Sequence, residues 1–388
     1  MNFLHTADWQ LGKPFARITD PDKAAKVRSE RVSAIKRIGT VAKDKNADFI
    51  LVAGDVFDSF TADKSTVSAA CSAIGEIGIP VIAIPGNHDH GGPGCLWEQE
   101  FFQKERRSLA PNFHILLDHA PLELDTAVIF PCPLLRRHES VDPTEWLRSF
   151  DFGSLKNKDL PRIALAHGSV HGFDSEGNDD EDNALSSPNL IALDRLPPDE
   201  FDFIALGDWH GTKKINSHAW YAGTPEIDRF PKGENNDPGN ILNIELTRGT
   251  TPTVEKITTA HLGWHVIEFD FASDEDVERL AEQLTDQIGN RAQEDLLQLT
   301  LRGSLGMKGS TRLGQLLETW RSRLLRLKEK DLVRTAPTPE EVAALTERAG
   351  DPLIANVATG LIHEAEGNSE EAEIARIALR ELYGAINR

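Results

Sequence analysis

Side chains that can bind metal ions follow five separate apolar runs of this sequence. They are carboxylates, amides and imidazoles, and each comes shortly after its run ends. In chain order, the residues are Asp8, Gln10, Asp55, Asn87, His88, His167, Asp208 and His210. In open α/β sheets, ligands bind beyond the carboxyl ends of the strands. If the apolar runs are strands of such sheets, these side chains meet at one edge and form a metal site.

The spacing inside these segments supports this interpretation. Asp8 and Gln10 lie two residues apart, so in an extended chain both side chains point to the same side. Asp208 and His210 repeat this spacing. The glycine before Asp55 lets the backbone turn sharply away from its strand. A single segment of this kind is usually a turn or a cap, but five of them in this order disfavour coincidence.

The elements that must position these residues follow an alternating pattern over residues 1–262. Short apolar runs alternate with longer amphipathic stretches, which is typical of a layered α/β domain. We expect a helix at 64–77 and strands at 2–6, 49–53, 81–84, 127–130, 163–166, 203–206 and 240–246. Two polar segments, 174–187 and 232–239, are expected to be loops.

The pattern changes after residue 262. Residues 264–271 and 296–301 are predicted to be strands, and 273–288 and 311–330 helices, which together form a small β-α-β-α domain over 263–334. Residues 335–388 are predicted to form a separate segment of two or three helices.

Composition limits the class of protein. With 388 residues, 39% of them hydrophobic, the chain can form a sizeable core and one or two smaller modules. It has no run of about eighteen apolar residues, so we expect no membrane-spanning segment. Cys71, Cys95 and Cys132 are widely spaced, which favours free thiols in a reducing cytoplasm. The net charge of -20 disfavours tight non-specific DNA binding, although divalent ions would add positive charge where a phosphate binds.

Several segments resemble the phosphoesterase motifs of the SbcD and MRE-eleven DNA repair nucleases. They are 5–12, 53–58, 85–89, 167–168, 207–210 and 221–226. The match covers the first domain in order, and the small second domain is similar in kind and place to the family's DNA-capping domain. The resemblance implies a four-layer metallophosphoesterase sandwich, with two sheets flanked by helices, followed by the capping domain and a helical C-terminus.

For the site, the resemblance implies two divalent ions, Mn²⁺ foremost, with Mg²⁺ or Fe²⁺ as alternatives. One ion would take Asp8, Gln10, Asp55 and His210. The other would take Asp55, Asn87, His167 and Asp208. His88 would be the catalytic histidine near the leaving oxygen, and Asp58 would either orient a ligand or cap the helix that follows.

Two positions depart from the family pattern. Gln10 and Asp208 stand where the family usually has histidine. Both replace a nitrogen ligand with oxygen, which shifts the site towards Mn²⁺ or Mg²⁺. The substitutions leave open a partly degenerate site that binds one ion, or neither, tightly.

The implied function is that of a metal-dependent DNA exonuclease, with endonuclease activity as an extension, in DNA repair or processing. The implied partners are DNA, an SbcC-type ATPase that would bind the terminal helices, and a second copy in a homodimer. Two alternatives stay open. One is a phosphatase or phosphodiesterase for small molecules, since the same metal motifs serve many substrates. The other is a non-catalytic subunit that binds DNA ends or the ATPase through a degenerate site.

Overall fold

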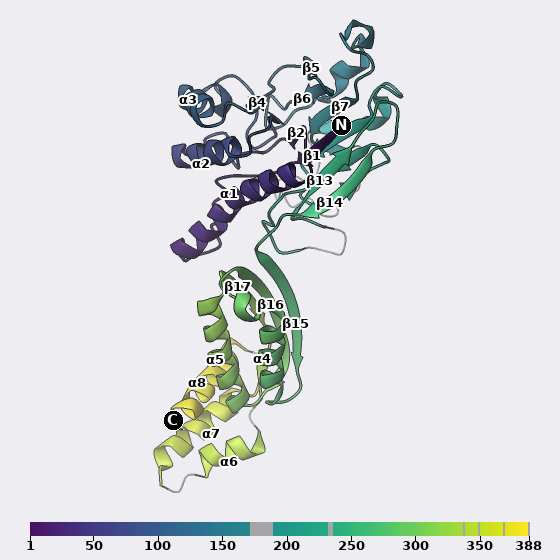
Figure 1. Ribbon diagram of the computed structural model, residues 1–388. Coiled ribbons are helices and arrows are strands. Elements are labelled where there is room, and N and C mark those ends of the chain that lie inside the picture. The colour runs from purple at the N-terminus through teal and green to yellow at the C-terminus, as the bar shows by residue number, and fades with distance from the viewer. Residues whose placement is uncertain (171–188, 232–235, 337, 348–349, 368, 387–388) are drawn as a thin grey trace. The chain divides into compact units, whose positions relative to one another are not determined.

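The computed structural model in Figure 1 divides the chain into two compact units, Met1–Leu262 and Gly263–Arg388. It describes residues 1–170, 189–231, 236–336, 338–347, 350–367 and 369–386. The predicted loop at 174–187 lies outside the described residues, as do the first four residues of the predicted loop at 232–239.

The first unit contains two six-stranded sheets, which confirms the expected two-sheet architecture. The first sheet has the order β14 (Thr253–Thr258), β13 (Asn240–Glu245), β1 (Asn2–Thr6), β2 (Phe49–Ala53), β3 (Val81–Ile84) and β4 (Phe113–Ile115). The second has the order β11 (Lys213–Lys214), β12 (Ala219–Tyr221), β10 (Phe203–Gly207), β7 (Arg162–His167), β6 (Val128–Cys132) and β5 (Leu122–Glu123). A small ribbon of β8 (Ser169–Val170) and β9 (Leu190–Ile191) accompanies them.

Successive side chains along each strand point to opposite faces of the sheet, and this alternation builds the core of the unit. In β2, Phe49, Leu51 and Ala53 pack in the cluster between the two sheets, and Ile50 and Val52 pack towards the helices. Those helices are α1 (Pro21–Asp44), α2 (Lys64–Gly75) and α3 (Glu100–Leu109), which lie together on the outer face of the first sheet (Figure 1).

The outer face of the second sheet is covered by aromatic side chains from short 3-10 turns and loops. Phe130 of β6 packs against Phe150, Phe152 and Phe201, with ring centroids 5.3–5.5 Å apart. Trp146 lies 6.1 Å from the same ring.

Parallel pairing brings the candidate site residues to one edge of the two sheets. Strands β1, β2 and β3 are adjacent and parallel, so the segments that follow them emerge side by side. Strands β7 and β10 are likewise adjacent and parallel in the second sheet.

The second unit contains a parallel sheet of β15 (Gly263–Phe271), β16 (Asp295–Leu305) and β17 (Arg326–Asp331) with helices α4 (Asp276–Gln287) and α5 (Met307–Arg323). The short strand β18 (Arg334–Thr335) pairs with the end of β16. The predicted helix at 311–330 is wrong in its last part, because α5 ends at Arg323 and a third strand follows. Leu324 and Leu327 continue the helical spacing, but the pairing of β17 with β16 decides the structure.

The C-terminal helices belong to this second unit and not to the separate segment that the sequence predicts. They are α6 (Pro339–Thr346), α7 (Pro352–Glu364) and α8 (Glu370–Ile386). Met307 of α5 shares one buried cluster with Leu345, Ala358 and Leu379 of these helices. Glu341 of α6 also accepts the backbone N–H groups of Met307 and Lys308 at 2.9 and 2.8 Å. Among the described helices, none is long and apolar enough to cross a membrane.

Candidate metal centre

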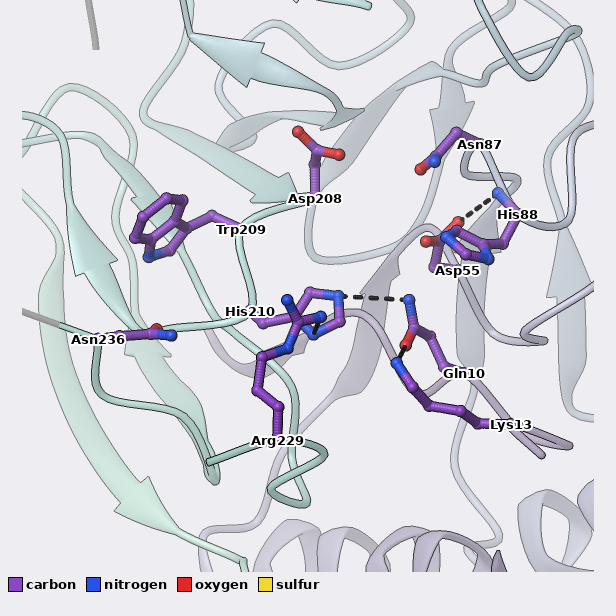
Figure 2. Close-up of a pocket in the computed structure, with 10 residues that line it drawn as sticks. All are labelled: Gln10, Lys13, Asp55, Asn87, His88, Asp208, Trp209, His210, Arg229 and Asn236. Atoms are coloured by element: carbon purple, nitrogen blue, oxygen red, sulfur yellow. Dashed lines mark hydrogen bonds between the residues drawn. The ribbon is translucent and has the colours of Figure 1, made fainter. Parts of the chain in front are cut away.

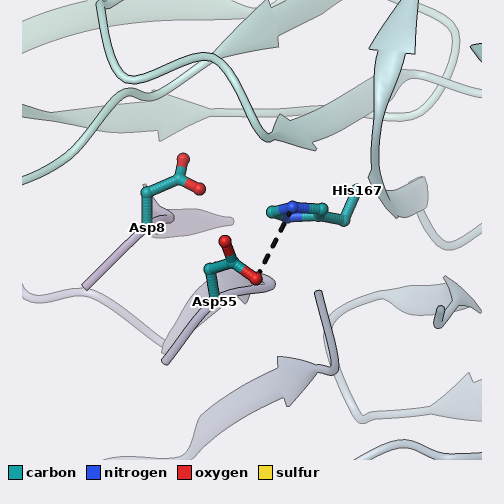
Figure 3. A group of neighbouring side chains, drawn as sticks. All are labelled: Asp8, Asp55 and His167. Carbon is teal, nitrogen blue, oxygen red and sulfur yellow. Dashed lines mark ion pairs between the residues drawn. The ribbon is translucent and has the colours of Figure 1, made fainter. Parts of the chain in front are cut away.

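Three buried side chains from the two sheets meet at the strand ends. Asp8 follows β1, Asp55 follows β2, and His167 is the last residue of β7. One ligand atom from each lies within 4.8 Å of the others, and His167 Nε2 is 3.7 Å from Asp55 Oδ1 (Figure 3). Carboxylate oxygen and imidazole nitrogen are suitable ligands for divalent ions.

The backbone at these positions adopts a conformation that non-glycine residues rarely take. The φ angles of Asp8, Asp55 and Gln10 are 53°, 53° and 41°, all in the left-handed region, and that of Asp208 is 105°. Hydrogen bonds between the loops hold it: the Asp8 N–H donates to the Gly54 carbonyl at 3.1 Å, and the Gln10 N–H to the Asp55 carbonyl at 2.8 Å. Such strain concentrates at functional sites.

Two glycines permit the close approach of the ligands. A Cβ atom on Gly54, whose φ is +88°, would lie 2.2 Å from His167 Nδ1. One on Gly86 would lie 2.1 Å from Asp55 Oδ1. Neither position therefore accepts a side chain without displacing a candidate ligand.

His167 is oriented by its neighbours. Its Nδ1 donates to the Ala53 carbonyl at 2.7 Å, so Nε2 faces the cluster, 2.8 Å from Asn87 Oδ1 and 3.9 Å from Asp208 Oδ1. Burial alone lowers the pKa of His167, but the negative charges of Asp55, Asp8 and Asp208 outweigh it and raise the pKa to about 9.

The local electrostatics fit a bound cation. Burial raises the pKa of the Asp8 carboxyl to about 8, and the nearby charge of His167 only partly opposes this effect. Asp208 contacts this carboxylate through its backbone N–H at 3.3 Å and accepts from Ser169 Oγ at 2.8 Å. Desolvated carboxylates this close together are stabilised by positive charge, which a divalent ion would supply.

Most of the remaining predicted site residues line a cavity that shares Asp55 with this cluster (Figure 2). They are Gln10, Asn87, His88, Asp208 and His210, together with Asp55. Gln10 Nε2 lies 3.3 Å from His210 Nε2, and Gln10 Oε1 accepts from Lys13 Nζ at 2.6 Å. Burial lowers the pKa of His210 to about 4, so its imidazole is neutral near pH 7.

His88 is held at the cavity by two hydrogen bonds. Its backbone N–H donates to Asp55 Oδ1 at 3.0 Å, and its Nδ1 lies 2.8 Å from the backbone carbonyl of Asp58. Asp58 therefore contacts His88 through its main chain. The Asp58 carboxyl does not cap α2, since Asp63 accepts from the Thr66 N–H at that helix start.

Three buried charged residues outside the predicted ligand sets support the site. Arg31 of α1 donates to the carbonyls of Trp9, Asp8 and Glu226 at 2.7, 3.0 and 3.1 Å. A charged residue on the apolar face of an amphipathic helix is the signal that could have identified it.

The other two are aspartates. Asp89 accepts from the N–H groups of Gly86 at 2.7 Å and Phe57 at 3.0 Å, and burial raises its pKa to about 7. Asp228 accepts from Lys13 Nζ at 2.7 Å and lies 3.1 Å from His210 Nδ1. No local pattern indicates the contact between Asp228 and Lys13, because the two residues are 215 positions apart in the sequence.

Comparison with known proteins identifies the family. The chain is similar to the solved structure of TT1561 of Thermus thermophilus, with 11% identity, a TM-score of 0.38, and coverage of 66% of this chain and 98% of that one. A second solved structure has 12% identity, a TM-score of 0.39 and the same coverage. Residues 1–237 match the family described as Calcineurin-like phosphoesterase. The chain therefore belongs to the calcineurin-like phosphoesterases, which hydrolyse phosphoester bonds with divalent metal ions.

Proposed function

We propose that this chain is a manganese-dependent DNA nuclease of the SbcD and MRE-eleven kind, an exonuclease with additional endonuclease activity. The observation that carries the proposal is the convergence of the motif residues that resemble those nucleases. From five strand ends, they meet around the Asp8, Asp55 and His167 cluster, with His88 at the adjoining cavity. Manganese suits a ligand set in which oxygen atoms outnumber nitrogen atoms.

The residues of the site have complementary tasks in phosphodiester hydrolysis. Asp8, Asp55 and His167 would hold a divalent ion, which would supply Lewis acidity for the phosphoryl group and lower the pKa of a bound water. The Asp58 carbonyl fixes the His88 ring through Nδ1, so an imidazolium there can donate its Nε2 proton to the leaving oxygen. Lys13 and Arg229 bring further positive charge to the same cavity, where it offsets the charge of a phosphate.

We further propose that the C-terminal helices bind an SbcC-type ATPase. Apolar side chains are exposed on α7 and α8: Leu353 is 72% exposed, Val357 46%, Ile374 61% and Ile377 48%. An apolar surface of this kind is typical of a protein-binding site. The second unit would act on DNA as a capping domain, and a homodimer stays a prediction. Three buried free cysteines agree with the proposed cytoplasmic location.

The experiment that tests the nuclease proposal measures degradation of linear DNA by the purified chain with Mn²⁺. We expect activity, with large losses for Asp55→Ala and His88→Ala. Unchanged activity in either variant would overturn the roles given to these residues. Retention of activity in Lys36→Met, which removes an exposed lysine paired with Glu76, is the control for charge changes far from the site.

A second candidate, hydrolysis of small phosphate esters, is favoured by the net charge of -20. Turnover of nitrophenyl phosphodiesters or nucleotides without any cleavage of DNA would support it against the nuclease. Metal binding without turnover of any ester would support a non-catalytic DNA-end or ATPase-binding subunit.

A further inference from the structure

We propose that Lys13 takes the place of one of the two metal ions, so that this chain binds a single divalent ion at the Asp8, Asp55 and His167 cluster. The inference rests on the proposed metal-dependent function and specifies how that site is built. It concerns the ion for which the sequence resemblance implies Gln10 and His210 among the ligands.

The orientation of Gln10 is set by Lys13. An ammonium group only donates hydrogen bonds, so the Gln10 atom 2.6 Å from Lys13 Nζ must be the amide oxygen. The amide nitrogen then faces His210 Nε2 at 3.3 Å. The one atom of Gln10 that could bind a metal ion is thus already bonded to a cation.

The ring of His210 is engaged at both nitrogens. The Gln10 amide nitrogen only donates, so His210 Nε2 accepts from it, and the proton of the neutral ring lies on Nδ1, 3.1 Å from Asp228 Oδ2. The guanidinium of Arg229 lies beside this pair: its Nη2 is 3.0 Å from His210 Nδ1, and its Nε donates to Asp228 Oδ1 at 3.2 Å. The Nε2 lone pair that a metal ion would need is therefore in use.

The ammonium group is fixed where it would repel a second ion. Lys13 Nζ bridges Gln10 Oε1 and the buried carboxylate of Asp228, at 2.6 and 2.7 Å. A Mg²⁺ ion bound to Gln10 Oε1 at about 2.1 Å would lie within about 4.7 Å of that nitrogen. Two cations at this distance in a partly buried site repel strongly.

The remaining cluster carries the charges of two carboxylates, Asp8 and Asp55. His167 Nε2 lies 2.8 Å from Asn87 Oδ1, so an ion bound there would replace a proton of that ring, whereas an ion at Gln10 would have to displace the Lys13 ammonium. Asp8, Asp55 and His167 bring three ligand atoms within 4.8 Å, and no other group of three His, Cys, Asp or Glu residues does so among the residues that the structure describes. His210 is not part of this group. The geometry thus supports one ion beside a fixed ammonium, which together provide positive charge for a phosphate.

The test is the metal stoichiometry of the full chain. The metal-free protein is titrated with Mn²⁺ by calorimetry, and bound Mn²⁺ is examined by electron paramagnetic resonance. We expect one ion per chain and the spectrum of an isolated ion. Two ions with comparable affinity, or the spectrum of a magnetically coupled pair, would overturn the proposal.

A double variant tests whether Lys13 is the cause. Gln10→His with Lys13→Met removes the ammonium and provides an imidazole, so we expect the stoichiometry to rise to two and the coupled spectrum to arise. If the folded double variant, checked by circular dichroism, still binds one ion, Lys13 is not what excludes the second. The variant Lys36→Met should bind one ion like the unaltered chain. Stoichiometry is independent of the substrate, so failure of the nuclease proposal would leave this result unchanged.

Discussion

Replacing Gly54 with alanine tests whether the close packing at the metal cluster is needed for activity. A left-handed residue other than glycine costs about 1–2 kcal/mol, and Gly54 has a φ of +88°. Its new Cβ atom would lie 2.2 Å from His167 Nδ1, whereas ordinary contact begins near 3.4 Å. The imidazole must therefore move by roughly the 1.2 Å difference, which disrupts its 2.7 Å hydrogen bond to the Ala53 carbonyl.

The expected loss of activity is large. A misplacement of this size typically reduces the rate about a hundredfold, so turnover of a nitrophenyl phosphodiester with Mn²⁺ should fall at least that far. Gly78→Ala is the matched control: its φ is +83°, and a Cβ atom there meets nothing within 4 Å. Urea unfolding should show the backbone cost in both variants, with activity kept only in Gly78→Ala. Wild-type turnover in Gly54→Ala, or an equal loss in Gly78→Ala, would contradict this prediction.

Three other predictions concern pH, His88 and the metal. Burial lowers the pKa of His5 from 6.5 to about 3, so the folded state keeps this ring neutral. The contribution of His5 to the free energy of unfolding is therefore fully present above pH 6.5 and falls as the pH drops, by about 2 kcal/mol at pH 5. His5→Phe, which keeps the ring packed near Phe203, should reduce this pH dependence in chelator-treated protein followed by denaturant unfolding; an unchanged slope would contradict it. His88→Ala should lower kcat by about 10²- to 10⁴-fold. Asp58→Ala should lower it by less than about tenfold, because the backbone carbonyl of Asp58, which the variant keeps, holds the His88 ring. Equal losses in the two variants would contradict this role of the main chain. Mn²⁺ at a hundred times its Kd should stabilise the fold by about 2.7 kcal/mol in thermal unfolding, and Asp55→Ala should abolish the effect.

Much of the site could be predicted because each ligand type follows an apolar run. Strands such as β2 and β3 are short, fully buried and end at glycine-containing turns, so local composition indicates both the strand and the position of the next polar residue. Parallel pairing then brings the segments together, a consequence of fold class rather than of any single residue.

What could not be predicted depends on long-range partners. The orientation of Gln10 depends on Lys13, which is held by Asp228 at a separation of 215 residues. In strand β17, Leu327 continues the helical spacing of the apolar residues in α5. Only the pairing of this segment with β16 makes it a strand instead of a further turn of the helix. Asp58 follows a motif that resembles the nucleases, yet its main chain makes the contact to His88. Sequence spacing identifies the residue types of a site but not which atoms meet.

The buried guanidinium of Arg31 has a consequence for how this protein is made. It joins the loop after the first strand to Thr224 and Glu226, which lie 193 and 195 residues after Arg31 in the sequence. During synthesis, the growing polypeptide cannot complete this clamp until residue 226 has left the ribosome, and contacts of such sequence separation form slowly. A nascent or prematurely terminated chain would therefore lack the contacts that join Arg31, and with it the loop of the first aspartate, to Thr224 and Glu226. Hydrolytic activity would begin only once the whole first unit has been translated.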